Sequence, residues 1–174
     1  MTGCTYLIAE SDIAPMCLSD IGSFFESHAK KVVGQIELRE LASLRDYPNG
    51  IYLFYKSGGQ RDELVYVGKA TSRSFIERIP AHFDSREDAW MNSLPKHAMR
   101  SEKLGTYQDA LALALSLKVL LLGVQGKSEG GRMEGVLRSF LAPRYNATRS
   151  RYTGAELLSD LLATGDVADP VADK

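Results

Sequence analysis

The sequence predicts an α+β domain, and three observations support this class. Its 174 residues are near the usual size of one domain, with 44% hydrophobic and 25% charged residues, as in ordinary globular proteins. Residues 51–55 and 64–67 are rich in β-branched and aromatic side chains and flank a Ser57-Gly58-Gly59 turn, which predicts a β-hairpin. Beyond the hairpin, segments with helical spacing surround one short apolar run at residues 118–124, which predicts a further buried strand.

The chain divides into an N-terminal helical arm, a core and a short acidic tail, with bounds at residues 1–48, 49–150 and 151–174. In the arm, apolar residues near helical spacing follow Ser19, a candidate N-cap, and residues 37–44 predict a second short helical turn. Pro48 and the Asn49-Gly50 pair end the arm, because both favour turns over helix.

A helix is predicted over residues 71–83, with Phe75, Ile79 and Phe83 on one stripe and Ser72 or Ser74 as its cap. Pro80 removes a backbone donor and is expected to bend this helix. The remaining helices are expected over residues 86–100, interrupted near Pro95, and over 106–115 and 128–142.

Two tyrosines of the predicted hairpin have a geometric relationship that depends on its register. A register roughly symmetric about Gly59 places Tyr52 opposite Tyr66 on the same face of the sheet, since side chains alternate along each strand. The length of the loop leaves this register open.

Several classes of protein are disfavoured. Cys4 and Cys17 are not spaced as a zinc or redox pair, so we interpret them as free thiols in a reducing compartment. The N-terminus lacks the pattern of an export signal. The most apolar segment, Ala110–Val124, contains Lys118 and falls short of the roughly 20 residues needed to span a bilayer. A cytoplasmic location without a membrane partner is therefore expected.

Local charge differs from the formal net charge of -1. Between Ser128 and Tyr152 there are five arginines and two glutamates, whereas the segment from Thr153 onward holds five acidic residues and Lys174. A neutral total can therefore hide a basic face beside an acidic tail.

The order of polar residues in the core is informative. The chain presents Gly50-Ile51-Tyr52, then Tyr66-Val67-Gly68-Lys69, then Arg78 and His82, Glu134, and finally Pro143-Arg144-Tyr145-Asn146. This series resembles the GIY-YIG nuclease superfamily, most closely the excision-repair variant with a YVGKA motif, over Asn49 to Asn146. The resemblance implies a small central antiparallel three-stranded β-sheet flanked by helices, connected β-β-α-β-α. Val67 replaces the isoleucine of the motif with a residue of the same type.

The resemblance also implies roles for these residues in cutting a phosphodiester. Glu134 is expected to hold Mg²⁺ or Mn²⁺, and Arg78 to contact the scissile phosphate through its fork of donors. Tyr52 is expected to accept a proton or position water, with Lys69 supplying the cation that a phenol of pKa about 10 needs. The other expectations are orientation of water or phosphate by Tyr66, proton relay by His82, contacts of nucleic acid with Lys69, Arg78, Arg144 and Asn146, and a mainly loop-fixing role for Asn146.

Structural alternatives exist for each residue. Tyr52 and Tyr66 taken alone are ordinary sheet aromatics, Arg78 and Glu134 alone are ordinary helix charges, and His82 is as well explained by a buried structural histidine. The functional interpretation depends on their order along the chain.

The sequence therefore predicts a metal-dependent endonuclease that acts on nucleic acid, with DNA favoured over RNA. The alternative is a catalytically inactive module of the same fold that binds nucleic acid or docks on a protein. The chain has no room for a separate recognition domain, so targeting is expected from the arm, from the insert at residues 84–103, from a partner or from a homodimer.

Overall fold

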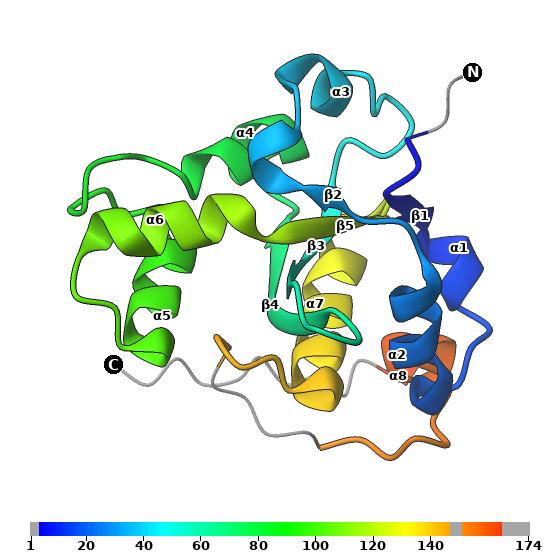
Figure 1. Cartoon of the computed structure of the whole chain (residues 1–174). Helices are drawn as coiled ribbons and strands as arrows, with labels where there is room; N and C mark the ends of the chain where they lie inside the picture. The colour runs from blue at the N-terminus through cyan, green and yellow to red at the C-terminus, as the bar shows by residue number, and fades with distance from the viewer. Residues whose placement is uncertain (1–3, 147–150, 165–174) are drawn as a thin grey trace.

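The computed structural model describes residues 4–146 and 151–164, which form an α+β fold around one mixed sheet (Figure 1). The strands of this described part are β1 (Leu7–Ala9), β2 (Lys31–Val32), β3 (Gly50–Lys56), β4 (Glu63–Ala70) and β5 (Lys118–Gly123). Its helices are α1 (Glu10–Ile13), α2 (Leu18–Ser27), the 3-10 helix η1 (Val33–Gln35), α3 (Leu38–Ala42), α4 (Phe75–Ala81), α5 (Ser93–Glu102), α6 (Tyr107–Ser116), α7 (Lys127–Leu141) and α8 (Leu158–Thr164). None of these helices has the length and apolar character required to cross a membrane.

The sheet has five strands, in contrast to the three that were predicted. Its order is β1-β5-β3-β4, with β2 also paired to β5. Strands β4 and β5 both run antiparallel to the central β3, and β1 runs parallel to β5. The two additional strands come from the predicted helical arm. They were missed because β1 has three residues and β2 has two, which is too short for an alternating pattern to emerge.

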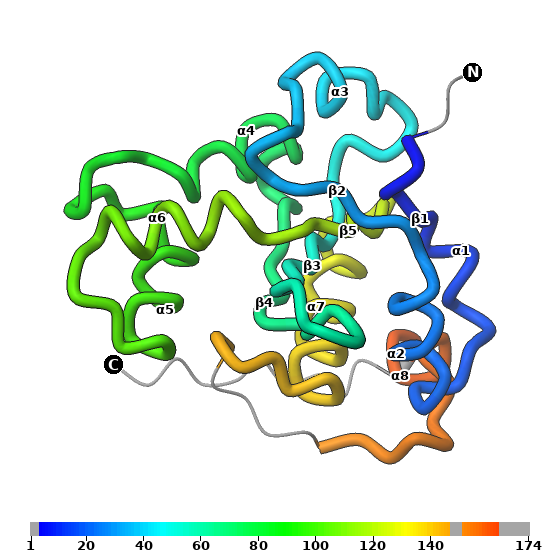
Figure 2. The backbone as a smooth tube through the Cα atoms, viewed as in Figure 1, coloured from blue at the N-terminus to red at the C-terminus, as the bar shows by residue number. Residues whose placement is uncertain are grey.

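Alternation along the strands creates two apolar layers. Tyr52 and Phe54 on β3 pack with buried residues of α4, α5 and α6, whereas Ile51, Leu53 and Tyr55 pack with residues of α2, α7 and α8. Figure 2 shows the pair α5–α6 set apart from the pair α2–α8. The sheet is therefore covered on both faces, which explains why β3 is almost wholly apolar.

The described part of the acidic tail is attached to the arm. The amides of Leu18 and Ser19 donate to the carbonyls of Glu156 and Gly154, and the amide of Leu158 donates to the carbonyl of Met16. These bonds hold α8 beside α2 (Figure 2). The described part of the tail thus packs with α2 on one face of the sheet.

The register of the β3–β4 hairpin differs from the symmetric prediction by two residues. Tyr52 lies opposite Gly68, and Tyr66 lies opposite Phe54. The two tyrosines nevertheless share a face, with ring centroids 6.3 Å apart and nearly parallel planes. A Cβ atom at Gly68 would lie 2.5 Å from the ring of Tyr52, so glycine is needed for the ring to lie across β4.

Two prolines affect helix ends. α4 begins with a capping box in which the backbone and hydroxyl of Ser74 donate to the carboxylate of Glu77. Pro80 lies near the end of α4, and the amide of His82 donates to the carbonyl of Ile79, 3.1 Å away, in a tight final turn. Pro80 thus lies in the last turn of α4, just before the helix ends at Ala81. Pro95 lies in the first turn of α5, where a missing amide costs little, so the predicted interruption there is wrong.

The loop after α7 is fastened along the outer edge of β4. Asn146 accepts a hydrogen bond from the amide of Val67 (2.7 Å) and donates one to its carbonyl (3.0 Å). The amide of Tyr145 donates to the carbonyl of Val65. The expected loop-fixing role of Asn146 agrees with these contacts.

Asn146→Ala should lower the free energy of unfolding by about 1–3 kcal/mol, because it leaves the buried amide and carbonyl of Val67 without partners. Urea unfolding followed by circular dichroism measures this change. Gln60→Ala, at an exposed position of the hairpin loop, is the control and should change stability by less than about 0.5 kcal/mol. Equal stability of the two variants would contradict the role assigned to the Asn146 side chain.

Candidate functional site

A buried hydrogen bond joins β3 to the end of α4. The hydroxyl oxygen of Tyr52 lies 2.8 Å from Nε2 of His82, and both residues are fully buried. Phe54, Tyr66 and Phe83 surround the imidazole, each in an edge-on arrangement with it. The tight turn at the end of α4 directs His82 toward the sheet, so Pro80 does not prevent it from reaching Tyr52.

Burial determines the protonation of this pair. It raises the pKa of the Tyr52 phenol well above its usual value, and the charge of Arg78 only partly opposes this. Burial also lowers the pKa of His82 to about 3, with further contributions from Arg78 and His97. Both groups are therefore neutral near pH 7.

The neutral imidazole of His82 can bond to Tyr52 in either of its two tautomers. With its proton on Nε2 it donates to the phenol oxygen. A neutral imidazole accepts the phenol proton at Nε2 when its own proton is on Nδ1. Nδ1 is buried and has no hydrogen-bond partner in the described part of the chain. His82 is thus held by one polar contact, with Tyr52.

The cation that acts on Tyr52 is Arg78. The resemblance had implied Lys69 in this role. Arg78 lowers the pKa of Tyr52 through its charge and a side-chain hydrogen bond, although burial outweighs both effects. Arg78 lies on α4, four residues before His82, and this spacing is consistent with its action on both Tyr52 and His82.

Tyr66 adds a second buried phenol. Burial raises its pKa, while a hydrogen bond with Ser93 and the charge of Arg78 oppose the shift. The ring of His97 lies 6.2 Å from the ring of Tyr66. Ser93 and His97 are one helical turn apart on α5, and sequence reasoning missed both because the start of this helix was not identified.

Glu134 on α7 is enclosed by cations. Its Oε2 lies 3.0 Å from Nζ of Lys69, and its Oε1 lies 3.7 Å from Nη1 of Arg138. The side chain of Glu134 is 13% exposed, whereas that of Lys69 is 41% exposed. Lys69 is thus directed to Glu134. The sequence prediction did not include Arg138. A cation four residues after an acid on one helix is a pattern typical of an ion pair, and it would have indicated this contact.

These groups converge from both faces of the sheet at the β4 edge. Alternation places Lys69 on the face covered by α7 and Tyr52 on the opposite face. The ring of Tyr52 crosses Gly68, and Glu134 acts electrostatically on the phenols of Tyr52 and Tyr66. The absence of a side chain at position 68 therefore leaves room for the ring of Tyr52 on its own face of the sheet.

Glu134 fits a divalent cation only as the single protein carboxylate of a hydrated site. In residues 4–146 and 151–164, no three His, Cys, Asp or Glu side chains form a metal-binding group. Mg²⁺ commonly uses one or two carboxylates together with waters and phosphate oxygens. A cation at Oε2 would take the place of the Lys69 ammonium, which has the exposure needed to move aside.

Two predicted nucleic-acid contacts lie outside this cluster. The guanidinium of Arg144 forms ion pairs with Glu102 and Glu63, and the buried amide of Asn146 is bonded to Val67. The structure therefore does not support Asn146 as a residue that touches nucleic acid.

The predicted basic face near the end of the core is also mostly neutralised. Arg132 and Arg138 pair with Glu129 and Glu134, as Arg144 does with its own acidic partners. Arg149 lies outside the described residues. The half-exposed cations of the site, Lys69 and Arg78, are therefore more relevant to an anionic ligand.

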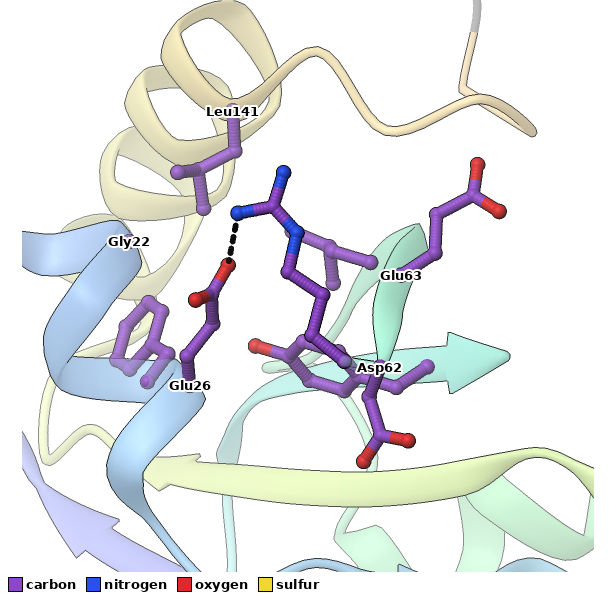
Figure 3. Close-up of a pocket in the computed structure, with 9 residues that line it drawn as sticks. Gly22, Glu26, Asp62, Glu63 and Leu141 are labelled. Carbon is purple, nitrogen blue, oxygen red and sulfur yellow. Dashed lines mark ion pairs between the residues drawn. The ribbon is translucent and has the colours of Figure 1, made fainter. Parts of the chain in front are cut away.

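A separate pocket of about 250 Å³ lies at the other end of the hairpin (Figure 3). Glu26, Asp62 and Glu63 line it together with Arg61, and Arg61 pairs with Glu26 at 3.8 Å. None of the predicted site residues contributes to its lining. Its surplus of carboxylates opposes phosphate binding, so it is not the candidate site.

Comparisons of the chain with protein-family models, with curated proteins and with solved structures find no match. The functional interpretation accordingly depends on the geometry described above.

The stability of the protein should fall as the pH falls below about 6.5, in part because of His82. Its pKa is about 3 in the folded protein and about 6.5 in an unfolded chain, so only the unfolded chain takes up a proton between these values. This linkage should cost about 2 kcal/mol between pH 7.5 and pH 5.

Urea unfolding at the two pH values, compared with the His82→Gln variant, measures this contribution. The variant should lose about 2 kcal/mol less than the wild type on acidification. His28→Gln, outside the buried cluster, is the control and should behave as the wild type. An identical pH dependence of wild type and His82→Gln would show that His82 is not held neutral.

Proposed function

We propose that the protein is a metal-dependent phosphodiesterase of the GIY-YIG type that cuts nucleic acid, with DNA as the favoured substrate. The observation that carries the proposal is the convergence of Tyr52, His82 and Arg78 with the Lys69–Glu134 pair at the β4 edge. A neutral phenol–imidazole pair that can position water, a carboxylate and two half-exposed cations are groups that phosphodiester hydrolysis can use.

Arg78 and Lys69 bind the phosphate in this proposal. Arg78 forms no ion pair with an acidic residue of the described chain, so the donors that it does not direct to Tyr52 are available to phosphoryl oxygens. When a phosphate and a divalent cation occupy the site, the ammonium group of Lys69 moves from Glu134 to the phosphoryl oxygens. The charge that develops on the phosphoryl oxygens is stabilised by both side chains.

Tyr52 positions the attacking water as a neutral phenol. Its raised pKa makes a resident phenolate unfavourable, so of the two roles expected for Tyr52 the water-positioning one is supported. The phenol oxygen, held by Nε2 of His82, keeps capacity for a further hydrogen bond, which water would occupy. Tyr66 supports the position of Tyr52 by packing its ring against that of Tyr52.

Mg²⁺ or Mn²⁺ held by Glu134 would lower the pKa of bound water and neutralise phosphate charge. Arg138 keeps the other carboxylate oxygen of Glu134 oriented. The side chain of Glu134, which is mostly buried, would thereby present one oxygen to the ligand.

A second candidate function is a module that binds nucleic acid without cutting it. The engagement of Glu134 by Lys69 favours this alternative, since a permanent ion pair would exclude a metal ion. Binding without hydrolysis in every metal would support it.

Glu134→Gln should reduce cleavage of plasmid DNA in Mg²⁺ by at least about 100-fold, because the neutral amide is a poor ligand for a hard cation. Gel electrophoresis of nicked and linear plasmid measures the rate, and EDTA should abolish it. Glu129→Gln, a more exposed acid on the same helix, should cut as the wild type does. Full activity in purified Glu134→Gln would assign the cleavage to another site or to a contaminant.

Arg78→Ala should also reduce cleavage by about 100-fold or more, because the transition state loses charge-assisted hydrogen bonds to phosphoryl oxygens. Arg61→Ala, on the hairpin loop at the far end of β4, provides the matched control. Rates with Mg²⁺ in excess measure the effect. If both arginine variants retained wild-type rates, Arg78 would have no part in the reaction.

A further inference from the structure

The exposed side chain of Trp90 is unusual for this protein. Trp90 is the sole tryptophan of the chain and is 82% exposed. It lies between α4 and α5, in the insert at residues 84–103. The guanidinium of Arg73 lies 5.9 Å from the centroid of its ring, and Arg73 also donates to Sδ of Met91 (3.2 Å). A large aromatic ring presented to water beside a cation is a feature of binding surfaces.

A cavity of about 250 Å³ connects Trp90 with the candidate site. Its charged lining residues are Lys69, Arg73 and Arg78, and no acidic residue of segments 4–146 and 151–164 lines it. Lys69 and Arg78 belong to the cluster around Glu134 and Tyr52. The cavity thus continues the candidate site and carries the charge that attracts phosphate.

The neighbouring cavity, which Trp90 also lines, has the opposite character. Asp84 and Asp88 line it, and only Arg86 opposes them, already paired with Asp84 at 2.7 Å. Trp90 therefore lies at the boundary between a cationic and an acidic cavity. A negatively charged strand is therefore attracted to the cavity that Lys69 and Arg78 line, and repelled by the acidic cavity.

We propose that Trp90 and Arg73 form a stacking site for an unpaired base of the DNA strand whose phosphate lies at Lys69 and Arg78. The inference rests on the proposed function and specifies its substrate class as DNA with unpaired bases beside the cleaved bond. An indole and a guanidinium offer flat surfaces to the face of any base. Bases in an intact duplex stack on one another, so the site selects against blunt double-stranded DNA.

Intrinsic fluorescence tests the site directly, because all tryptophan emission comes from Trp90. The wild-type protein is titrated in EDTA with oligothymidine and with a blunt duplex of equal length, so that binding is measured without hydrolysis. Oligothymidine should quench the emission with saturation. The duplex should require at least about 10-fold higher concentration for the same effect.

Anisotropy of labelled oligothymidine extends the test to variants. Trp90→Ala should weaken binding about 10-fold or more, and Trp90→Phe, which keeps an aromatic face, should weaken it less. Arg73→Ala should weaken binding, whereas Arg61→Ala should not. Because Trp90 is exposed, its substitution should leave urea unfolding unchanged.

Three results would overturn the inference: equal affinity for duplex and single strand, unchanged affinity in Trp90→Ala, or no quenching by any oligonucleotide. The last result would leave Trp90 as a contact for a protein partner. Failure of the proposed function is distinguishable, since it would appear as quenching by oligothymidine with no cleavage in Mg²⁺ or Mn²⁺. Conversely, cleavage that requires Glu134 and is unchanged in Trp90→Ala would reject only the stacking site.

Discussion

The packing of Tyr52 across Gly68 is the constraint on which the rest of the site depends. The ring occupies the space of a missing side chain on β4, which requires the register that places Tyr52 opposite Gly68. Its hydroxyl then meets His82 at the end of α4, so the sheet and that helix are held in one arrangement by a buried contact. With the ring in this position, residues from opposite faces of the sheet act on one another.

The site separates neutral groups from charged ones. Tyr52, Tyr66 and His82 lie in a buried aromatic layer where burial disfavours their ionised forms. Lys69, Arg78 and Glu134 lie nearer to the solvent, where charge is less costly. Such a division lets fixed charges attract a ligand while the interior keeps its polar groups in one protonation state.

Patterns of apolar residues predicted much of the fold, because β3, β4 and β5 are apolar runs that are mostly buried, and α4 and α7 bury apolar residues at helical spacing. The order of polar residues also predicted that Tyr52, Arg78, His82 and Glu134 belong together, and they act on one another in the structure. The register was wrong because a long loop does not define it, and the partner of Lys69 depends on how α7 packs. Trp90 lies in residues 86–92, where the predicted helix is wrong because α5 begins only at Ser93, and its exposure in the folded chain is what distinguishes it.

The contact between Asn146 and Val67 has a consequence for association between molecules. An edge strand normally presents free amides and carbonyls that can template pairing with a strand of another chain. At Val67 both groups are already occupied by one side chain, and Tyr145 occupies the carbonyl of Val65. Lateral growth of the sheet by intermolecular strand addition, the first step toward aggregation, is therefore blocked along this stretch of β4.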